Sequence, residues 1–265
     1  MRKMMIAGNW KMNLNTTESS LLVHRLNQRI QIHRDIEILL APSLLSLQPI
    51  SLEIDRRKFR LAAQNAYFKD EGAYTGEVSF TMLRDLVHYV IIGHSERRIY
   101  FHETLEVVRD KVAAAVRNRI TPLLCIGETD QERKAGETKQ VIHDQLTTAL
   151  SNLTARDVED MVIAYEPVWA ISTFNGILAK PHEVEEVMKR IRYEIEELYG
   201  QNAAQTVRIL YGGSVDEQLV RGYLEVDDCD GALVGSASLN YHKFSAIIDS
   251  AYHLLQEQKK EDAKQ

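Results

Sequence analysis

Short apolar runs recur along this chain at intervals that leave room for one helix between neighbouring runs, and this spacing constrains the fold more than any other feature. Each run has the length and β-branched content of a buried strand. The runs cover residues 4–7, 36–41, 59–63, 89–92, 122–126, 161–164, 207–210 and 231–234. Eight strand–helix units in 265 residues average about 33 residues each, the size of a βα repeat. The sequence therefore predicts the α/β class, as a single (β/α)8 barrel.

The segments between these runs show helical periodicity, clearest where Pro181 suits a first helical turn. One face of that predicted helix carries Val184, Val187, Met188, Ile191, Ile195 and Leu198. A doubly wound open sheet is the structural alternative, but it requires a glycine-rich loop after the first strand, where this chain reads Gly-Asn-Trp-Lys from Gly8. No linker divides the chain, so we expect one domain over residues 1–255 and a charged, disordered tail over 256–265.

Composition argues against several classes of protein. The formal net charge of -6 gives no footprint for nucleic acid, and no basic amphipathic segment suggests a membrane surface. No apolar stretch approaches the ~20 residues of a membrane span, and the run before Gly8 is too short for a signal peptide, so we expect a cytoplasmic protein. Two cysteines, Cys125 and Cys229, are too few for a disulfide framework, and Cys125 is expected to be a buried thiol.

A carboxylate stands at the end of the sixth strand run, where the chain continues as Tyr165-Glu166-Pro167. Pro167 fixes its own backbone, restrains Glu166 to extended geometry and stops the strand. Glu166 therefore projects from a stiff pivot at the rim of the predicted sheet, as suits a general base. Taken alone, the residue is as readily a strand-end carboxylate that faces solvent.

Three further polar or glycine-rich segments follow predicted strands. They begin at Gly8, Gly93 and Tyr211, and they read Gly-Asn-Trp-Lys-Met-Asn, Gly-His-Ser-Glu-Arg-Arg and Tyr-Gly-Gly-Ser-Val. Parallel α/β folds place their ligands at the carboxyl ends of their strands, so we expect these segments and Glu166 to converge. In their order and spacing along nearly the whole chain, the four segments resemble the triosephosphate isomerase family.

This resemblance implies a catalytic barrel that interconverts dihydroxyacetone phosphate and D-glyceraldehyde 3-phosphate through an enediolate, without cofactor or metal, in glycolysis and gluconeogenesis. It assigns the base to Glu166, the electrophile that polarises the carbonyl to His94, and the stabilisation of developing charge to Lys11. Without that context, His94 is more readily a packed core residue, and Lys11 is a surface charge or a Schiff-base nucleophile.

Supporting residues are implied by the same resemblance. Asn9 helps to orient the substrate oxygens, Glu96 pairs with Lys11, and Ser95 is a candidate hydrogen-bond partner of Glu166. A purely structural salt bridge is an equally good account of Glu96, and the two readings are compatible.

The phosphate is expected to be held by backbone N–H groups rather than by arginine. By resemblance these groups belong to Ser172, Ser214, Gly235 and Ser236, with Ser236 standing where the family has a second glycine. The segment over residues 170–180 departs further, because it is two residues longer than the family's lid. These departures leave open a paralogue that acts on a tetrulose phosphate and, from another class, a non-catalytic phosphosugar-binding barrel.

The segment from Gln64 to Glu77 resembles the loop that family members insert into a neighbouring subunit, with Thr75 docking beside the Lys11 loop of a second copy. An ordinary βα loop is the alternative. We expect a homodimer that takes a small phosphorylated sugar as its ligand, with no nucleic-acid or membrane partner.

Overall fold

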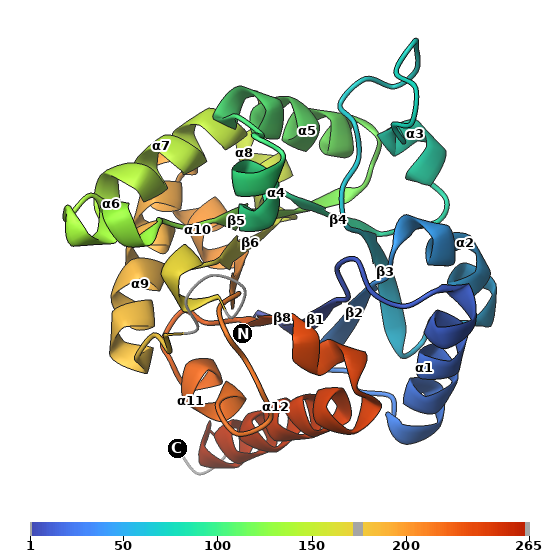
Figure 1. Ribbon diagram of the computed structural model, residues 1–265. Coiled ribbons are helices and arrows are strands. Elements are labelled where there is room, and N and C mark those ends of the chain that lie inside the picture. The colour runs from blue at the N-terminus through green and yellow to red at the C-terminus, as the bar shows by residue number, and fades with distance from the viewer. Residues whose placement is uncertain (1, 172–176, 263–265) are drawn as a thin grey trace.

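The structure, a computed structural model, describes residues 2–171 and 177–262. Within these residues, eight parallel strands close into one barrel in chain order (Figure 1). The strands are β1 (Met4–Asn9), β2 (Ile36–Ala41), β3 (Phe59–Ala63), β4 (Tyr89–Ile92), β5 (Thr121–Ile126), β6 (Val162–Tyr165), β7 (Arg208–Tyr211) and β8 (Gly231–Val234). The barrel closes where β8 pairs in parallel with β1, with Ala232 opposite Ile6. The predicted α/β class and single (β/α)8 barrel are confirmed.

The ends of some strands differ from the sequence prediction. The bounds of β2, β3, β4 and β8 are those predicted, whereas β1 continues to Asn9 and β5 begins one residue earlier, at Thr121. Strands β6 and β7 are each displaced by one residue, so that they end on Tyr165 and Tyr211. Both tyrosines are buried, and aromatic side chains suit a buried strand position as well as β-branched ones do.

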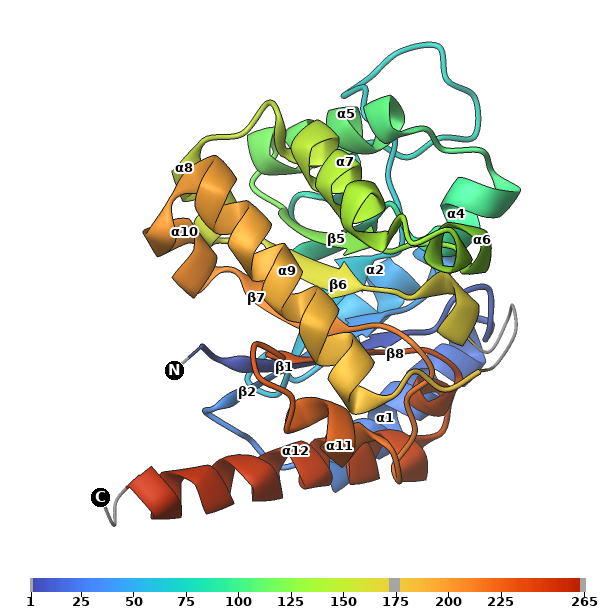
Figure 2. The ribbon, with the colours of Figure 1, turned by 90° about the vertical axis from the view of Figure 1, so that its left-hand side faces the viewer.

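Helices surround the barrel on all sides (Figure 1). They are α1 (Thr16–Arg29), α2 (Leu44–Glu53), α3 (Phe80–Leu83), α4 (Ser95–Tyr100), α5 (Leu105–Arg117), α6 (Asp130–Lys134), α7 (Thr138–Leu150), α8 (Ala155–Glu159), α9 (Pro181–Tyr199), α10 (Gln201–Thr206), α11 (Val220–Leu224) and α12 (Tyr241–Asp262), with 3-10 helices η1 (Val168–Ala170) and η2 (Ser236–Leu239). Figure 2 shows both chain termini at one end of the barrel and α4 and α6 at the other end.

Helix α9 begins at Pro181, as its periodicity predicts. Its buried face includes Val184, Met188 and Ile191, and the buried side chains lie on one side of the helix. Leu198 is 38% exposed, so the predicted apolar face is one turn too long.

Alternation of side chains along the strands divides the core into two layers. From β1, Met5 and Ala7 join a cluster inside the barrel, while Met4 and Ile6 pack with the surrounding helices. The inner cluster fills the barrel, which is a packed core and not a pore. Cys125 belongs to this inner cluster and is a buried free thiol, as predicted.

Residues 256–262 continue α12, where the sequence predicts a disordered tail over 256–265; residues 263–265 lie outside the described residues. Side-chain pairs hold these last turns to the rest of the molecule: Arg221 donates to Glu257 at 2.6 Å, and Lys259 lies 2.7 Å from Asp35. Charged residues that appear free in the sequence therefore have partners in distant elements. No helix within the described part of the chain combines the length and apolar character needed to cross a membrane.

Candidate active site

A pocket of about 600 Å³ opens at the carboxyl ends of the strands. The predicted residues that line it are Asn9, Lys11, His94, Glu166, Ser214, Gly235 and Ser236. These residues follow or end β1, β4, β6, β7 and β8, so the strand-end segments do converge. Ser172 lies outside the described residues.

Glu166 follows β6 directly and is only 1% exposed. Its N–H donates to the carbonyl of Ile126 at 2.7 Å, so the pairing with β5 continues through Glu166 before Pro167 turns the chain into η1. Gly212 leaves room for the carboxylate, because a Cβ at that position would lie 2.8 Å from Cγ of Glu166. Glu166 is therefore a buried carboxylate facing the pocket, and the alternative of a strand-end residue facing solvent is wrong.

Two donors hold the Glu166 carboxylate. Its Oε1 lies 3.1 Å from Nε2 of His94, and its Oε2 accepts from the backbone N–H of Ser95 at 3.1 Å. Burial acts to raise the pKa of Glu166, but His94, the Ser95 amide and the Arg98 guanidinium outweigh burial and hold that pKa below its usual value. The carboxylate is thereby kept ionised, which is the state that a base requires. The Ser95 hydroxyl is buried and has no hydrogen-bond partner among the described residues.

His94 occupies the N-cap position of α4, where its Nδ1 accepts from the backbone N–H of Glu96 at 3.2 Å. Because Nδ1 is an acceptor, this contact assigns the proton of a neutral imidazole to Nε2, the nitrogen that faces Glu166. Gly93 turns the chain from β4 into α4 with a φ of +72°, and a Cβ there would lie 3.1 Å from the carbonyl oxygen of Cys125. The turn thus delivers a histidine donor to the pocket.

Lys11 has a φ of +53°, a left-handed conformation that is unfavourable for residues other than glycine. Three contacts fix it there. Its N–H donates to Oδ1 of Asn9 at 3.0 Å, its carbonyl accepts from the side chain of Gln64 at 2.9 Å, and its Nζ lies 2.6 Å from Oε1 of Glu96. The ammonium group is therefore held at the pocket by an ion pair, as the resemblance implies for Glu96.

Sequence reasoning missed the role of Arg98, which is part of the segment that starts at Gly93. The Arg98 guanidinium donates to the carbonyl of Gly93 at 2.9 Å and to that of Gly127 at 3.1 Å. Burial lowers the pKa of Arg98, although the charge of Glu166 acts to raise it. Arg98 thus ties the ends of β4 and β5 together beside the base.

Glu128 is a second buried charge that the sequence analysis missed. Its carboxylate accepts from the indole N–H of Trp169 at 2.9 Å and from the hydroxyl of Tyr165 at 3.1 Å, and its carbonyl accepts from the N–H of Val168 at 3.0 Å. Burial raises the pKa of Glu128 despite these donors. Glu128 therefore fastens η1 to the end of β5. The available signal was its position, since it follows a strand run just as Glu166 does.

At the opposite side of the pocket, Ser214 is bonded to η1. Its hydroxyl and its N–H both donate to the carbonyl of Ala170, at 2.7 Å and 3.1 Å, whereas the resemblance implies that this N–H faces a phosphate. Ser236 begins η2 and is not among the described residues with positive φ. A serine in place of the family's glycine therefore causes no backbone strain at this position. Asn240 and Lys243 also line this side and were not singled out from the sequence.

The site therefore combines a buried, ionised carboxylate, a histidine N–H that points at it, and an ammonium group beside them. Such a set is suited to moving a proton to and from carbon next to a polarised carbonyl. Its position at the carboxyl end of a closed parallel barrel is where enzymes of this architecture carry out their chemistry. Fold and site together define the class of (β/α)8-barrel isomerases.

Comparison with known proteins narrows this class. A family model described as triosephosphate isomerase matches residues 4–251. Proteins named triosephosphate isomerase from Clostridium tetani and Chloroherpeton thalassium are each 43% identical to this chain, over 250 and 253 residues; the matches cover 94% and 95% of this chain, and 97% and 100% of those proteins. The protein of that name from Carboxydothermus hydrogenoformans is 43% identical over 249 residues, with 94% of this chain and 98% of its own covered. The chain belongs to the triosephosphate isomerase family.

Proposed function

We propose that this chain interconverts dihydroxyacetone phosphate and D-glyceraldehyde 3-phosphate, as a cytoplasmic enzyme of glycolysis and gluconeogenesis. The observation that carries this proposal is the pairing of Glu166 with Nε2 of His94 at 3.1 Å, in a pocket that Lys11 also lines. A protein that only binds a phosphosugar needs no buried, ionised base. The non-catalytic alternative therefore leaves this pairing without a purpose.

In the first half of the reaction, Glu166 takes a proton from C1 of dihydroxyacetone phosphate. The electron pair of that C–H bond forms the C1–C2 double bond, and the C2 carbonyl oxygen becomes negatively charged. The Nε2–H of His94 donates to this oxygen, and the ammonium of Lys11 stabilises the developing charge and attracts the phosphate dianion. The substrate carbons take the place of the direct contact between Glu166 and His94.

In the second half, Glu166 returns its proton to C2. The proton on the C1 oxygen moves to the C2 oxygen, and we assign this exchange to Nε2 of His94, the ring nitrogen that faces Glu166. The product is the aldehyde, and no atom is gained or lost. Backbone N–H groups of Gly235 and Ser236 are the proposed phosphate donors, with Ser214 after release from Ala170; the proposed contact of Ser172 lies outside the described residues.

A longer phosphoketose is the alternative substrate, because the segment over residues 170–180 is two residues longer than the family's lid. No observation on the described lining of the pocket favours the extra carbon, so we propose the triose. Residues 171 and 178 line the pocket on either side of the part of this segment that is not described.

The test follows the carbon-bound proton. Purified chain is incubated in deuterated water with triose phosphates and, separately, with a tetrulose phosphate, and the exchange of the C1 or C2 proton is measured by NMR together with turnover. We expect rapid exchange and turnover of both trioses and much slower conversion of the tetrulose. Binding of triose phosphates without exchange of the carbon-bound proton would contradict the proposed function.

We further propose that two copies associate through the loop over residues 64–77. This loop projects from the barrel between β3 and α3 (Figure 1). Beside Lys11 lies a groove of about 470 Å³ whose lining includes Met12 and Leu44, and Met12 is 97% exposed. In the proposed dimer, Thr75 of one copy occupies the groove of the other, which covers this apolar surface.

A further inference from the structure

A second polar pocket, of about 490 Å³, lies at the amino ends of β3, β4 and β5, opposite the candidate active site. Its lining includes Arg56, Arg60, Arg84, Arg119, His88 and Glu37, and we call it the amino-mouth pocket. Arg60 lies in β3, His88 directly precedes β4, and Arg119 lies just before β5. None of these residues lines the candidate active site or takes part in the proposed reaction.

The arginines of the amino-mouth pocket carry more positive charge than their surroundings neutralise. Within residues 2–171 and 177–262, Arg56, Arg84 and Arg119 form no ion pair. The carboxylate of Glu37 already accepts from Arg208 at 2.6 Å, and Arg60 lies 3.9 Å from its other oxygen. Asp85 is the other carboxylate in the lining. In a chain of net charge -6, this is a concentrated positive surface.

Arg119 provides the second observation. Its backbone has a φ of +60°, in the left-handed region that costs an ordinary residue free energy. Its guanidinium makes no hydrogen bond or ion pair with any other residue that the structure describes. This conformation ends α5: the N–H of Arg119 donates to the carbonyl of Val116 at 2.9 Å, and that of Ile120 donates to Ala115 at 3.0 Å. The turn leaves the Arg119 guanidinium exposed at the pocket, where a ligand can reach it.

The neighbouring contacts position this charge. Arg84 donates to the side-chain oxygen of Asn118 at 2.6 Å, and Asn118 is buried and directly precedes Arg119. The pKa of His88 is lowered by burial first and then by the charges of Arg60 and Arg56, so their positive potential is felt inside the pocket.

We propose that the amino-mouth pocket binds a small polyvalent anion, a metabolite that carries two or more phosphate or carboxylate groups. Guanidinium groups match both kinds of group through paired N–H donors, and several arginines around one pocket suit several anionic groups on one ligand. The apolar lining is limited to Val87 and Tyr89; the ring of Tyr89 is buried and its hydroxyl donates to Glu37. Apart from the exposed His88 imidazole, the described lining offers no aromatic surface, so we assign the pocket to a polar ligand.

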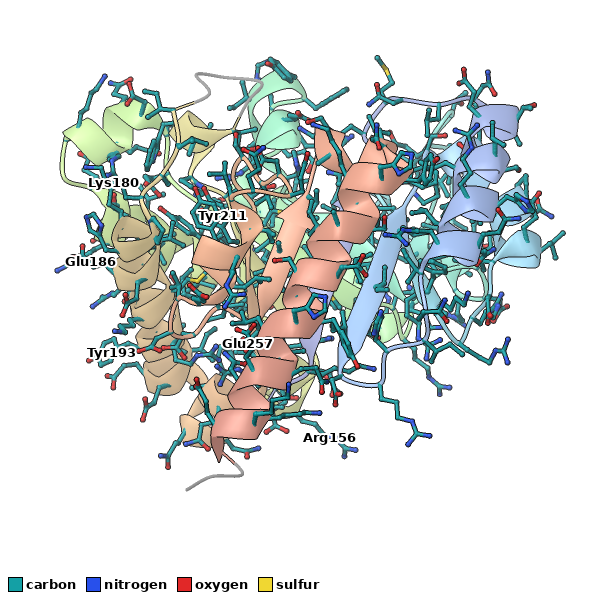
Figure 3. The ribbon with its side chains drawn as sticks, turned by 90° about the horizontal axis from the view of Figure 1, so that it is seen from below. Arg156, Lys180, Glu186, Tyr193, Tyr211 and Glu257 are labelled. Atoms are coloured by element: carbon teal, nitrogen blue, oxygen red, sulfur yellow. The ribbon has the colours of Figure 1, made fainter. Side chains whose placement is uncertain are left out.

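The experiment measures binding of three probes by isothermal titration calorimetry at about 0.15 M salt, where exposed charges are screened. The probes are inorganic tripolyphosphate, citrate and inorganic phosphate, and the first two distinguish polyphosphate from polycarboxylate ligands. The variants are Arg84→Ala, Arg119→Gly and their combination. The matched control is Arg156→Ala, which removes an exposed arginine from α8 at the same end of the barrel (Figure 3).

We expect tripolyphosphate or citrate to bind more tightly than phosphate, and the double variant to lose about tenfold or more in affinity. Arg156→Ala is expected to bind as the unaltered chain does, and isomerase turnover is expected to be unchanged in all variants. Arg119→Gly relieves backbone strain, so loss of binding with an unchanged or higher thermal midpoint separates ligand binding from misfolding. Equal affinity in the double variant, or no binding of either polyvalent anion, would overturn the proposal.

Discussion

Glu166 illustrates how a buried side chain can remain charged. Burial alone would favour the neutral acid, which cannot act as a base. His94 and the Ser95 amide each contact one oxygen of the carboxylate, and Arg98 adds positive charge nearby. The free energy that these contacts supply is what makes the position usable for proton transfer.

The first prediction concerns the reach of this carboxylate. Glu166→Asp retracts the carboxylate by one methylene, and misplacement of about 1 Å can reduce a rate about 100-fold. We expect turnover number to fall by about that factor while affinity for a phosphate-bearing inhibitor changes little. The matched control is Glu106→Asp, the same substitution at an exposed position of α5. Full activity of Glu166→Asp would show that Glu166 is not the catalytic base.

The second prediction concerns Lys11. Lys11→Met keeps much of the side-chain volume but removes the charge that pairs with Glu96 at 2.6 Å. We expect a higher KM and a lower turnover number together, because in the proposed reaction the ammonium acts both on the substrate phosphate and on the developing oxyanion. Borohydride treatment of the unaltered enzyme with substrate should leave Lys11 unmodified by mass spectrometry. A reduced adduct on Lys11 would support the Schiff-base alternative instead.

At the scale of elements, what was predictable from the sequence followed from local pattern. A β-branched run followed by a polar segment is visible in the sequence, so the strands and the positions of His94 and Glu166 could be predicted. The contact between Glu128 and Trp169 was not predictable, because it joins residues 41 positions apart and depends on the register in which β5 pairs with β6. The last turns of α12 were missed for a similar reason, since the partners of their charges lie in distant elements.

The third prediction concerns a contact that joins three strands at the amino end of the barrel. Glu37 of β2 accepts from Arg208 of β7 at 2.6 Å and from Tyr89 of β4 at 2.9 Å. Burial acts to raise the pKa of Glu37, but Arg208 and Tyr89 outweigh it, so its pKa is lowered on folding. The ionised form is therefore preferred by the folded state. The contribution of the Glu37 charge to the free energy of unfolding is fully present above the pKa of an unfolded glutamate, about 4.3. It is lost as pH falls through the lower pKa of the folded state.

Glu37→Gln should accordingly reduce the free energy of unfolding by roughly 1–3 kcal/mol at neutral pH. The difference from the unaltered chain should shrink as pH falls below about 4.3, because the wild-type carboxylate then gains a proton. Urea unfolding at a series of pH values measures this, with Glu197→Gln on the exposed side of α9 as the control. A difference independent of pH would contradict the assignment of the stabilisation to the charge of Glu37.

For the whole molecule, the barrel has two ends of different character. The carboxyl end gathers the candidate active site and, beside it, the groove next to Lys11. Exposed apolar side chains near that groove include Met12 and Leu45, the latter 84% exposed. Because Lys11 has a strained backbone and lies at this surface, an occupant of the groove would also fix the catalytic loop. Association and activity are therefore expected to change together.

The last prediction tests this coupling. Thr75→Arg places a long charged side chain at the exposed tip of the loop over residues 64–77. In the proposed dimer this side chain would lie beside the ammonium of Lys11 of the second copy. The added arginine and Lys11 carry the same charge, and the groove around them is partly apolar, so the substitution opposes association. We expect light scattering to give a mass near 30.3 kDa for the variant and twice that value for the unaltered chain. Turnover should fall about 10- to 100-fold because the Lys11 loop loses its support. Thr206→Arg, at the exposed end of α10, is the matched control and should remain dimeric and active. A Thr75→Arg variant that stays dimeric would show that this loop is not the interface, and a fully active monomer would separate association from catalysis.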